Sequence, residues 1–191
     1  MRSSGQRFSM RGMAAFAGGA AAAFVAARVL PPFLAQAAGT ARAAAGQDPF
    51  DMLARDHRIV LDLLEDLEHS PDNATFARAQ KLLMVKRRLS AHALAEEDVI
   101  YPMLNEAAGA VSDVRHLYAE HAEIKMHLHA LEQMPKNDPG WARRAGELRA
   151  LVQSHARQEE EIDFPKLRAA LSERETRLMT GNMQREKALL L

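Results

Sequence analysis

The segments HALAEEDVIYP, from His92 to Pro102, and HARQEEEIDFP, from His155 to Pro165, repeat one pattern in a chain of 191 residues. In each segment a histidine is followed four residues later by a glutamate, and an aromatic residue and a proline close the pattern. Four residues advance an α-helix by about 400°, so the histidine and the glutamate share one helix face. Each segment can therefore offer an imidazole and a carboxylate to the same point.

A further histidine precedes each segment on the helix before it. The interval from His57 to His92 matches the interval from His121 to His155 to within one residue. The offset between the two copies is likewise the same, to within one residue, for the first histidine of each pair and for the second. The chain therefore contains one helix pair used twice, in which the first helix carries a histidine and the second carries His-x-x-x-Glu.

Apolar residues around this repeat recur at helical spacing and predict four long helices separated by short turn clusters. The four predicted helices begin at Asp48, run from about Ala74 to Leu104, run from roughly Val111 to Gln133, and run from near Trp141 to Pro165. Pro102 is expected to kink or end the second helix. Long helices with short connections predict an all-α fold, an up-and-down antiparallel four-helix bundle.

The composition excludes several kinds of site. The chain has no cysteine, which rules out disulfides, thiolate catalysis and iron–sulfur ligation by its own residues. Its 25 basic and 25 acidic residues balance, so the net charge predicts no nucleic-acid partner. Aromatic residues make up only 5% of the chain, and no alternating run of β-branched residues predicts a strand.

Residues 1–46 differ from the remainder. Arg2, Arg7 and Arg11 precede an uncharged run over 12–27, and no acidic residue occurs before Asp48. A basic start followed by an apolar run is typical of an export signal, although the run is short for a membrane span of about 20 residues. The alternatives are a signal peptide, a membrane anchor and a disordered leader. The corresponding locations are exported or periplasmic, membrane-associated, and cytoplasmic. We assign residues 1–46 to this leader, 47–170 to the bundle and 171–191 to a C-terminal helical tail.

Six polar side chains of the repeat fall on the apolar stripes and are expected to point into the core: His57, His92, Glu96, His121, His155 and Glu159. Unpaired buried charge costs several kcal/mol or more. Two divalent cations would neutralise both carboxylates and accept a lone pair from each imidazole. The pattern therefore predicts a two-metal site with open positions for oxygen or another small ligand.

This set resembles the hemerythrin-like HHE cation-binding domain, whose pattern is H…HxxxE…H…HxxxE in a four-helix bundle. The resemblance covers roughly residues 48–170 and includes the pairs Tyr101-Pro102 and Phe164-Pro165. It implies two non-haem iron ions bridged by the two glutamates, with zinc or manganese as less favoured metals. Lys125 and Glu160 stand where the oxygen-carrying hemerythrins have a histidine and an aspartate. The chain is thus similar to the bacterial HHE type, and reversible oxygen carriage is not implied.

The resemblance leaves three classes of function open. The favoured one is a di-iron protein that binds O2, nitric oxide or a peroxide for sensing, buffering or stress defence. The second is an enzyme that reduces peroxide or nitric oxide, or that donates iron for repair. The third is a structural bundle whose polar core holds zinc or no metal.

Residues beside the repeat have open roles. Tyr118 lies three residues before His121, on the same face. It is either a half-buried core tyrosine, a donor to Glu159 or to a bound ligand, or itself an iron ligand. Glu160 competes with Glu159 as the metal ligand, and the match to Glu96 favours Glu159. Asp56 and Glu120 could orient the histidines that follow them, but a side chain one residue before a helical ligand points about 100° away, which predicts a solvent-facing role.

Overall fold

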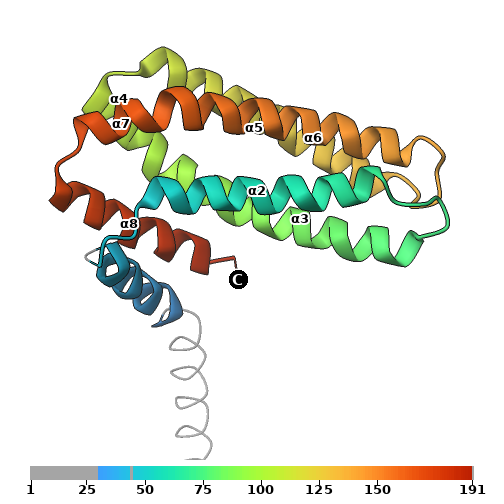
Figure 1. The fold of residues 1–191 in the computed structure, drawn as a ribbon, viewed down its shortest axis with the longest axis horizontal. Coiled ribbons are helices and arrows are strands. Elements are labelled where there is room, and N and C mark those ends of the chain that lie inside the picture. The colour runs from blue at the N-terminus through green and yellow to red at the C-terminus, as the bar shows by residue number, and fades with distance from the viewer. Residues whose placement is uncertain (1–29, 44, 191) are drawn as a thin grey trace, which may run out of the picture.

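The computed structural model describes residues 30–43 and 45–190, and within these residues it contains helices and no strand. Four long helices form the bundle: α2 (Pro49–Glu68), α3 (Thr75–Ala95), α5 (Val111–Gln133) and α6 (Trp141–Gln158). They run side by side along the long axis of the molecule (Figure 1). α2 packs on α3 and α6, and α5 packs on α6, whereas α3 and α5 have the least contact among neighbouring helices of the bundle. The predicted all-α bundle is confirmed.

Local signals fix where the helices begin and end. The Asp48 carboxylate accepts hydrogen bonds from the backbone N–H groups of Phe50 and Asp51 at 2.8 and 3.3 Å, which caps α2. Pro49 occupies the first turn of α2, where a missing N–H costs nothing. Gly109 ends the helix before α5 with a φ of 64°, in the left-handed region that glycine adopts without strain.

The second and fourth bundle helices each contain a π turn. α3 passes into η1 (Glu96–Ile100) and then α4 (Tyr101–Ala108), while α6 passes into η2 (Glu159–Asp163) and then α7 (Phe164–Ala170). The expected helix end near Leu104 is corrected, because the helical path continues to Ala108. The break in α geometry lies ahead of Pro102, which sits in the first turn of α4.

Two apolar clusters lie on either side of the level at which the repeated histidines sit. One, near η1 and α7, includes Leu53, Tyr101, Leu104 and Phe164. The other, toward the α2–α3 turn, includes Leu64, Leu82, Leu131, Trp141 and Leu148. Burial of each large apolar side chain stabilises the fold by about 1.5–3 kcal/mol. The polar residues of the repeat are therefore held between two well-packed apolar layers.

The C-terminal tail forms α8 (Glu173–Ala188), which packs outside the bundle against α3, η1 and α2. Its first turn is fixed by a capping box between Ser172 and Glu175. A helix over residues 30–43 lies beside α8 (Figure 1). α8 therefore lies between this N-terminal helix and the C-terminal end of α3.

Glycines allow the two outer helices to approach closely. A Cβ atom at Gly39 would lie 2.9 Å from the carbonyl oxygen of Thr180, and one at Gly181 would lie 3.0 Å from that of Gln36. The Gln36 amide donates a hydrogen bond of 2.7 Å to the Asn182 side chain across this contact. A side chain larger than hydrogen at Gly39 or Gly181 would separate the two helices.

The greater part of the predicted leader, residues 1–29, lies outside the described residues. Among the helices that the structure does describe, none combines the length and the apolar character needed to cross a membrane.

Arg78 ties together the loops at the end of the bundle far from α8. Its side chain is fully buried and stacks over the Trp141 ring at 4.8 Å. The guanidinium donates to the Ser70 carbonyl and hydroxyl oxygens and to the Lys136 carbonyl, each at 2.7 Å. One cation thus satisfies acceptors from both the α2–α3 loop and the α5–α6 loop.

Arg78→Met is expected to lower the free energy of unfolding by about 3 kcal/mol, because it leaves buried acceptors without donors. Urea unfolding measures the loss. Lys81→Met is the matched control, since Lys81 pairs with Asp66 on the surface of the same helix pair and should change stability by less than about 1 kcal/mol. A loss in Arg78→Met no larger than the small loss expected for Lys81→Met would show that the hydrogen bonds of Arg78 do not stabilise the fold.

Candidate metal centre

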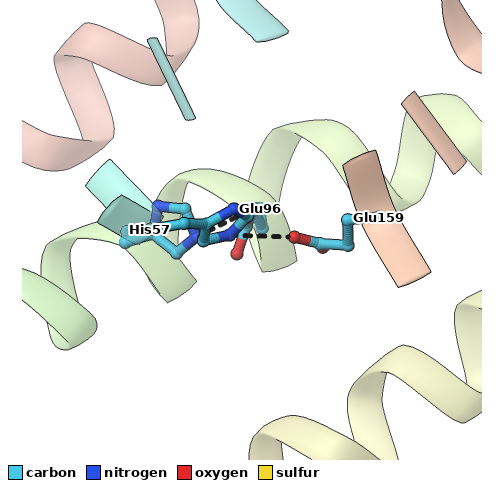
Figure 2. A group of neighbouring side chains, drawn as sticks. His57, Glu96 and Glu159 are labelled. Atoms are coloured by element: carbon cyan, nitrogen blue, oxygen red, sulfur yellow. Dashed lines mark hydrogen bonds and ion pairs between the residues drawn. The ribbon is translucent and has the colours of Figure 1, made fainter. Parts of the chain in front are cut away.

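The six polar residues of the repeat converge at one level of the bundle. They come from all four bundle helices, and each is buried: His57, His92, Glu96, His121, His155 and Glu159. Both glutamates are 0% exposed. His57, Glu96 and Glu159 point toward one another from three separate helical segments (Figure 2). The sequence pattern thus identified a set of side chains that the fold brings into one cluster.

One half of the cluster is built on α2 and α3. The Nε2 atoms of His57 and His92 lie 2.8 Å apart. Glu96 Oε1 lies 2.9 Å from His92 Nε2, and Glu159 Oε2 lies 3.3 Å from His57 Nε2. Two imidazole nitrogens and two carboxylate oxygens therefore face one point.

The other half is built on α5 and α6. The Nε2 atoms of His121 and His155 lie 3.1 Å apart. Glu96 Oε2 is 3.4 Å from His121 Nε2, and Glu159 Oε2 is 3.4 Å from His155 Nε2. Each glutamate therefore faces both histidine pairs, and the two oxygens of Glu96 are divided between them. This is the arrangement of a bridging carboxylate.

The buried carboxylates lack the donors that burial normally demands. Both side-chain oxygens of Glu96 and Oε2 of Glu159 are buried without a hydrogen-bond partner. A desolvated carboxylate needs a cation or several donors to offset a cost of several kcal/mol. The four imidazoles and two carboxylates form a nitrogen and oxygen donor set that suits iron, manganese or zinc. The residues therefore fit a pair of metal ions.

When no metal is bound, a proton on His92 partly neutralises the negative charge of the two buried glutamates. Burial lowers the pKa of His92, but the Glu96 carboxylate and Asp56 outweigh it and raise that pKa to about 9. Burial likewise opposes ionisation of Glu96, yet His92 and His121 hold the pKa of Glu96 well below its usual range. A metal ion at this point would displace the His92 proton and take over its role.

A carboxylate on the outside of the cluster faces the other ring nitrogen of each histidine, and three of the four lie within hydrogen-bond distance. The pairs and their distances are His57 Nδ1 with Glu160 at 2.8 Å, His121 Nδ1 with Glu97 at 2.7 Å, His155 Nδ1 with Glu120 at 3.1 Å, and His92 Nδ1 with Asp56 at 3.7 Å. These partners follow the internal repeat. A carboxylate on Nδ1 keeps the proton there and leaves Nε2 free to bind a metal.

These contacts correct one expectation from the sequence and decide between two alternatives that it left open. Asp56 and Glu120 do not have the solvent-facing role that was predicted, because each faces the histidine of the neighbouring helix rather than the one that follows it in the chain. The structure also distinguishes Glu159 from Glu160 as the candidate metal ligand. Glu159 points into the cluster, whereas Glu160 lies on its outside, against His57.

Tyr101, rather than Tyr118, reaches the cluster. The Tyr101 hydroxyl is buried, donates to Glu159 Oε1 at 3.0 Å and lies 3.0 Å from His121 Nε2. Burial and the Glu159 and Glu96 carboxylates raise the pKa of Tyr101, which keeps its donor proton. The predicted bond from Tyr118 to Glu159 is therefore made by Tyr101. The sequence contained a signal for the role of Tyr101. The repeat places Phe164 at the equivalent position, so the hydroxyl of Tyr101 is a feature of one half only.

Tyr118 instead forms a hydrogen bond to the backbone of the π turn η1. Its hydroxyl donates to the backbone carbonyl of Glu97 at 2.9 Å, and its side chain is 42% exposed. In the π pattern an N–H reaches the carbonyl five residues back, as that of Tyr101 reaches Glu96. Pro102 has no N–H to offer to Glu97. Tyr118 supplies the missing donor.

A small cavity of about 50 Å³ adjoins the four histidines and is lined by residues of both α3 and α5. Its other walls are largely apolar and include Leu89, Ile124, Leu128 and Val152, with Lys125 also lining it. A water molecule takes about 30 Å³ of liquid volume, so the space has room for a small molecule only.

The family model described as hemerythrin HHE cation binding domain matches residues 48–167. The chain is 32% identical over 126 residues to a DNA nickase of Nostoc sp., which covers 66% of this chain and 35% of that protein. It is 29% identical over 143 residues to an uncharacterized hemerythrin-like protein of Schizosaccharomyces pombe, which covers 72% of this chain and 68% of that protein. The chain thus spans only about a third of the first relative's length.

The fold is also similar to that of a solved structure. It is a hemerythrin HHE cation-binding domain-containing protein from Mycobacterium kansasii, with a TM-score of 0.63 and 21% identity. The similarity covers 74% of this chain and 88% of that chain. At this identity the likeness establishes the fold of the bundle.

Proposed function

This chain belongs to the hemerythrin HHE cation-binding domain family, and from that premise we propose that it is a non-haem di-iron protein that binds O2, nitric oxide or a peroxide. Its role would be sensing, buffering or stress defence. The observation that carries the proposal is the pair of fully buried glutamates that face two histidine pairs, with three of their oxygens lacking any hydrogen-bond donor. Two cations at this point would satisfy those oxygens.

Two overlapping groups of residues would hold the metals. His57, His92, Glu96 and Glu159 form one, and Glu96, His121 and His155 form the other. When bound, a pair of iron ions supplies a redox-active Lewis-acid centre on which a small oxidising molecule can bind. Six protein ligands shared between two metals leave coordination positions free for that molecule.

The protein's own residues prepare the site for small ligands. The outer carboxylates hold the Nδ1 protons and so direct the Nε2 atoms inward. Tyr101 occupies one oxygen of Glu159 and leaves the other free to face both histidine pairs. The apolar walls of the cavity next to the histidines exclude bulk water and large solutes.

Metal loading tests the proposal. The full chain is loaded anaerobically with ferrous iron, bound metal is quantified per chain, and visible spectra are recorded before and after exposure to air or nitric oxide. About two irons per chain, with new absorption bands on exposure, support the proposal. A preference for zinc, or less than about one iron per chain, would overturn it. Stoichiometric consumption of peroxide fits a binding protein, whereas sustained turnover would favour the enzyme alternative.

Tyr101→Phe is expected to weaken iron binding by roughly tenfold to a hundredfold, because residues that orient metal ligands typically contribute that much affinity. The loss of the hydroxyl frees Glu159 Oε1 and leaves a second buried oxygen without a donor. Competition with a coloured chelator measures the change. Tyr118→Phe removes the other tyrosine hydroxyl of the ring pair and should leave the affinity unchanged. A loss confined to Tyr118→Phe would instead support the prediction made from the sequence.

A further inference from the structure

The four histidines differ in how closely an outer carboxylate approaches Nδ1. Three of them have a carboxylate oxygen within 3.1 Å of Nδ1, whereas the nearest one to His92 lies at 3.7 Å. His92 Nδ1 is buried and makes no hydrogen bond. The Asp56 oxygen, at 3.7 Å, is beyond hydrogen-bond distance. His92 is therefore the least firmly held of the four imidazoles.

A lysine from outside the bundle engages the carboxylate that should serve His92. Lys187, on α8, forms an ion pair with Asp56 Oδ2, which is also the oxygen nearest to His92. The Lys187 side chain is only 13% exposed, so water screens this pair weakly. The contact links the C-terminal helix directly to the outer side of the cluster.

The length of the acidic side chain explains why only this position is affected. Glu97 also pairs with a lysine, Lys125, yet it stays 2.7 Å from His121 Nδ1. Glutamates occupy three of the four outer positions, and the fourth is an aspartate, which is one methylene shorter. An aspartate held by Lys187 does not also reach His92.

Asp56 has room to move. A cavity of about 100 Å³ lies between α3 and α8 and is lined by Asp56, Arg88, Ala91, His92 and Lys187. A shift of about 0.8 Å would bring Asp56 Oδ2 from 3.7 Å to the separation of about 2.9 Å that is typical of a hydrogen bond. The ion pair with Lys187, rather than steric crowding, sets the present distance.

We propose that Lys187 is a positioning residue of the metal centre, which holds Asp56 away from His92 and makes the metal position of His57 and His92 the weaker of the two. The inference rests on the proposed function, because it concerns the relative affinities of two bound metals. It assigns α8, which lies outside the bundle, a part in setting how metal is distributed in the centre.

Stepwise iron affinities test the inference. The full-length wild type and Lys187→Met are titrated anaerobically with ferrous iron against a competing chelator. The weaker step is expected to tighten by about tenfold in Lys187→Met, the lower end of the effect of an outer carboxylate, and the tighter step to stay unchanged. Lys187→Arg keeps the charge and should behave as wild type. Lys125→Met removes the equivalent lysine from Glu97 and should leave the difference between the steps as it is.

A second measurement does not depend on metal. In ¹⁵N NMR spectra of metal-free Lys187→Met, the Nδ1 proton of His92 should show the downfield shift of a hydrogen bond to a carboxylate. Asp56→Asn should change the weaker step by less than about threefold, whereas Glu120→Gln, its counterpart in the repeat, should cost at least about tenfold. Equal costs, or an unchanged or weaker step in Lys187→Met, would overturn the inference. A wild type that binds no pair of metals would instead refute the proposed function.

Discussion

Glu96→Gln is expected to reduce bound iron from about two ions per chain to one or fewer, with a loss of affinity of at least roughly a hundredfold. In the wild type, one oxygen of Glu96 lies 2.9 Å from His92 and the other lies 3.4 Å from His121, so each faces a different histidine pair. Glutamine keeps the shape of the side chain but cannot neutralise a metal, and its NH2 group would point a donor at one of the two positions. Because Glu96 belongs to both ligand groups, one substitution affects both metals.

The effect is measured by metal content and by the thermal stabilisation that iron produces. A ligand that binds only the folded state raises the unfolding temperature, so wild type should shift on iron addition and Glu96→Gln should shift little. Glu97→Gln is the matched control, since Glu97 is the next residue but touches only the outer side of His121. It should retain both metals, with about tenfold to a hundredfold weaker binding at one position. Two tightly bound irons in Glu96→Gln would rule out a bridging role for this carboxylate.

The stability of the metal-free protein and its iron affinity should change in opposite directions with pH. Burial lowers the pKa of His92, but Glu96 outweighs that effect, and the pKa is raised from 6.5 to about 9. A raised pKa favours folding below the unfolded value, so this contribution is fully present below about pH 6.5 and is lost as pH rises to about 9. The loss is on the order of 3 kcal/mol.

Iron affinity should increase over the same range, by up to about tenfold per pH unit, because a metal that binds His92 must displace its proton. Thermal unfolding of the metal-free protein and chelator competition, each between pH 6 and 9, measure the two slopes. Metal-free Glu96→Gln is the control: without the carboxylate that raises the pKa of His92, the slope of stability should largely disappear. Stability and affinity that rise together with pH would contradict this account.

The sequence was sufficient to predict the bundle and the six residues of the cluster. The apolar stripes locate the helices, and the recurrence of His-x-x-x-Glu in the second half of the chain places both pairs at one level. Both signals depend on spacing within a helix, which the α-helical repeat fixes. The positions of Glu96 and Glu159 could therefore be inferred without knowing how the helices pack.

Residues whose roles depend on contacts between helices could not be predicted. Asp56 and Glu120 face histidines on neighbouring helices, which intrahelical spacing does not reveal. The tyrosines were misassigned because a π turn adds a residue and rotates the rest of the helix by about 100°, so that Tyr101 reaches the cluster. Lys187 lies in α8, outside the bundle and 131 residues from Asp56 on α2, and no local pattern connects the two.

The two π turns also bear on the origin of the chain. They begin at Glu96 and Glu159, so their separation along the chain equals that of His92 and His155. Each corresponds to one extra residue accommodated in an otherwise regular helix. Separate insertions would have had to fall at the same place twice, whereas one insertion in an ancestral helix pair, copied by a later gene duplication, explains both. On that history the halves began as equals and have since diverged, with a hydroxyl at Tyr101 but not at Phe164.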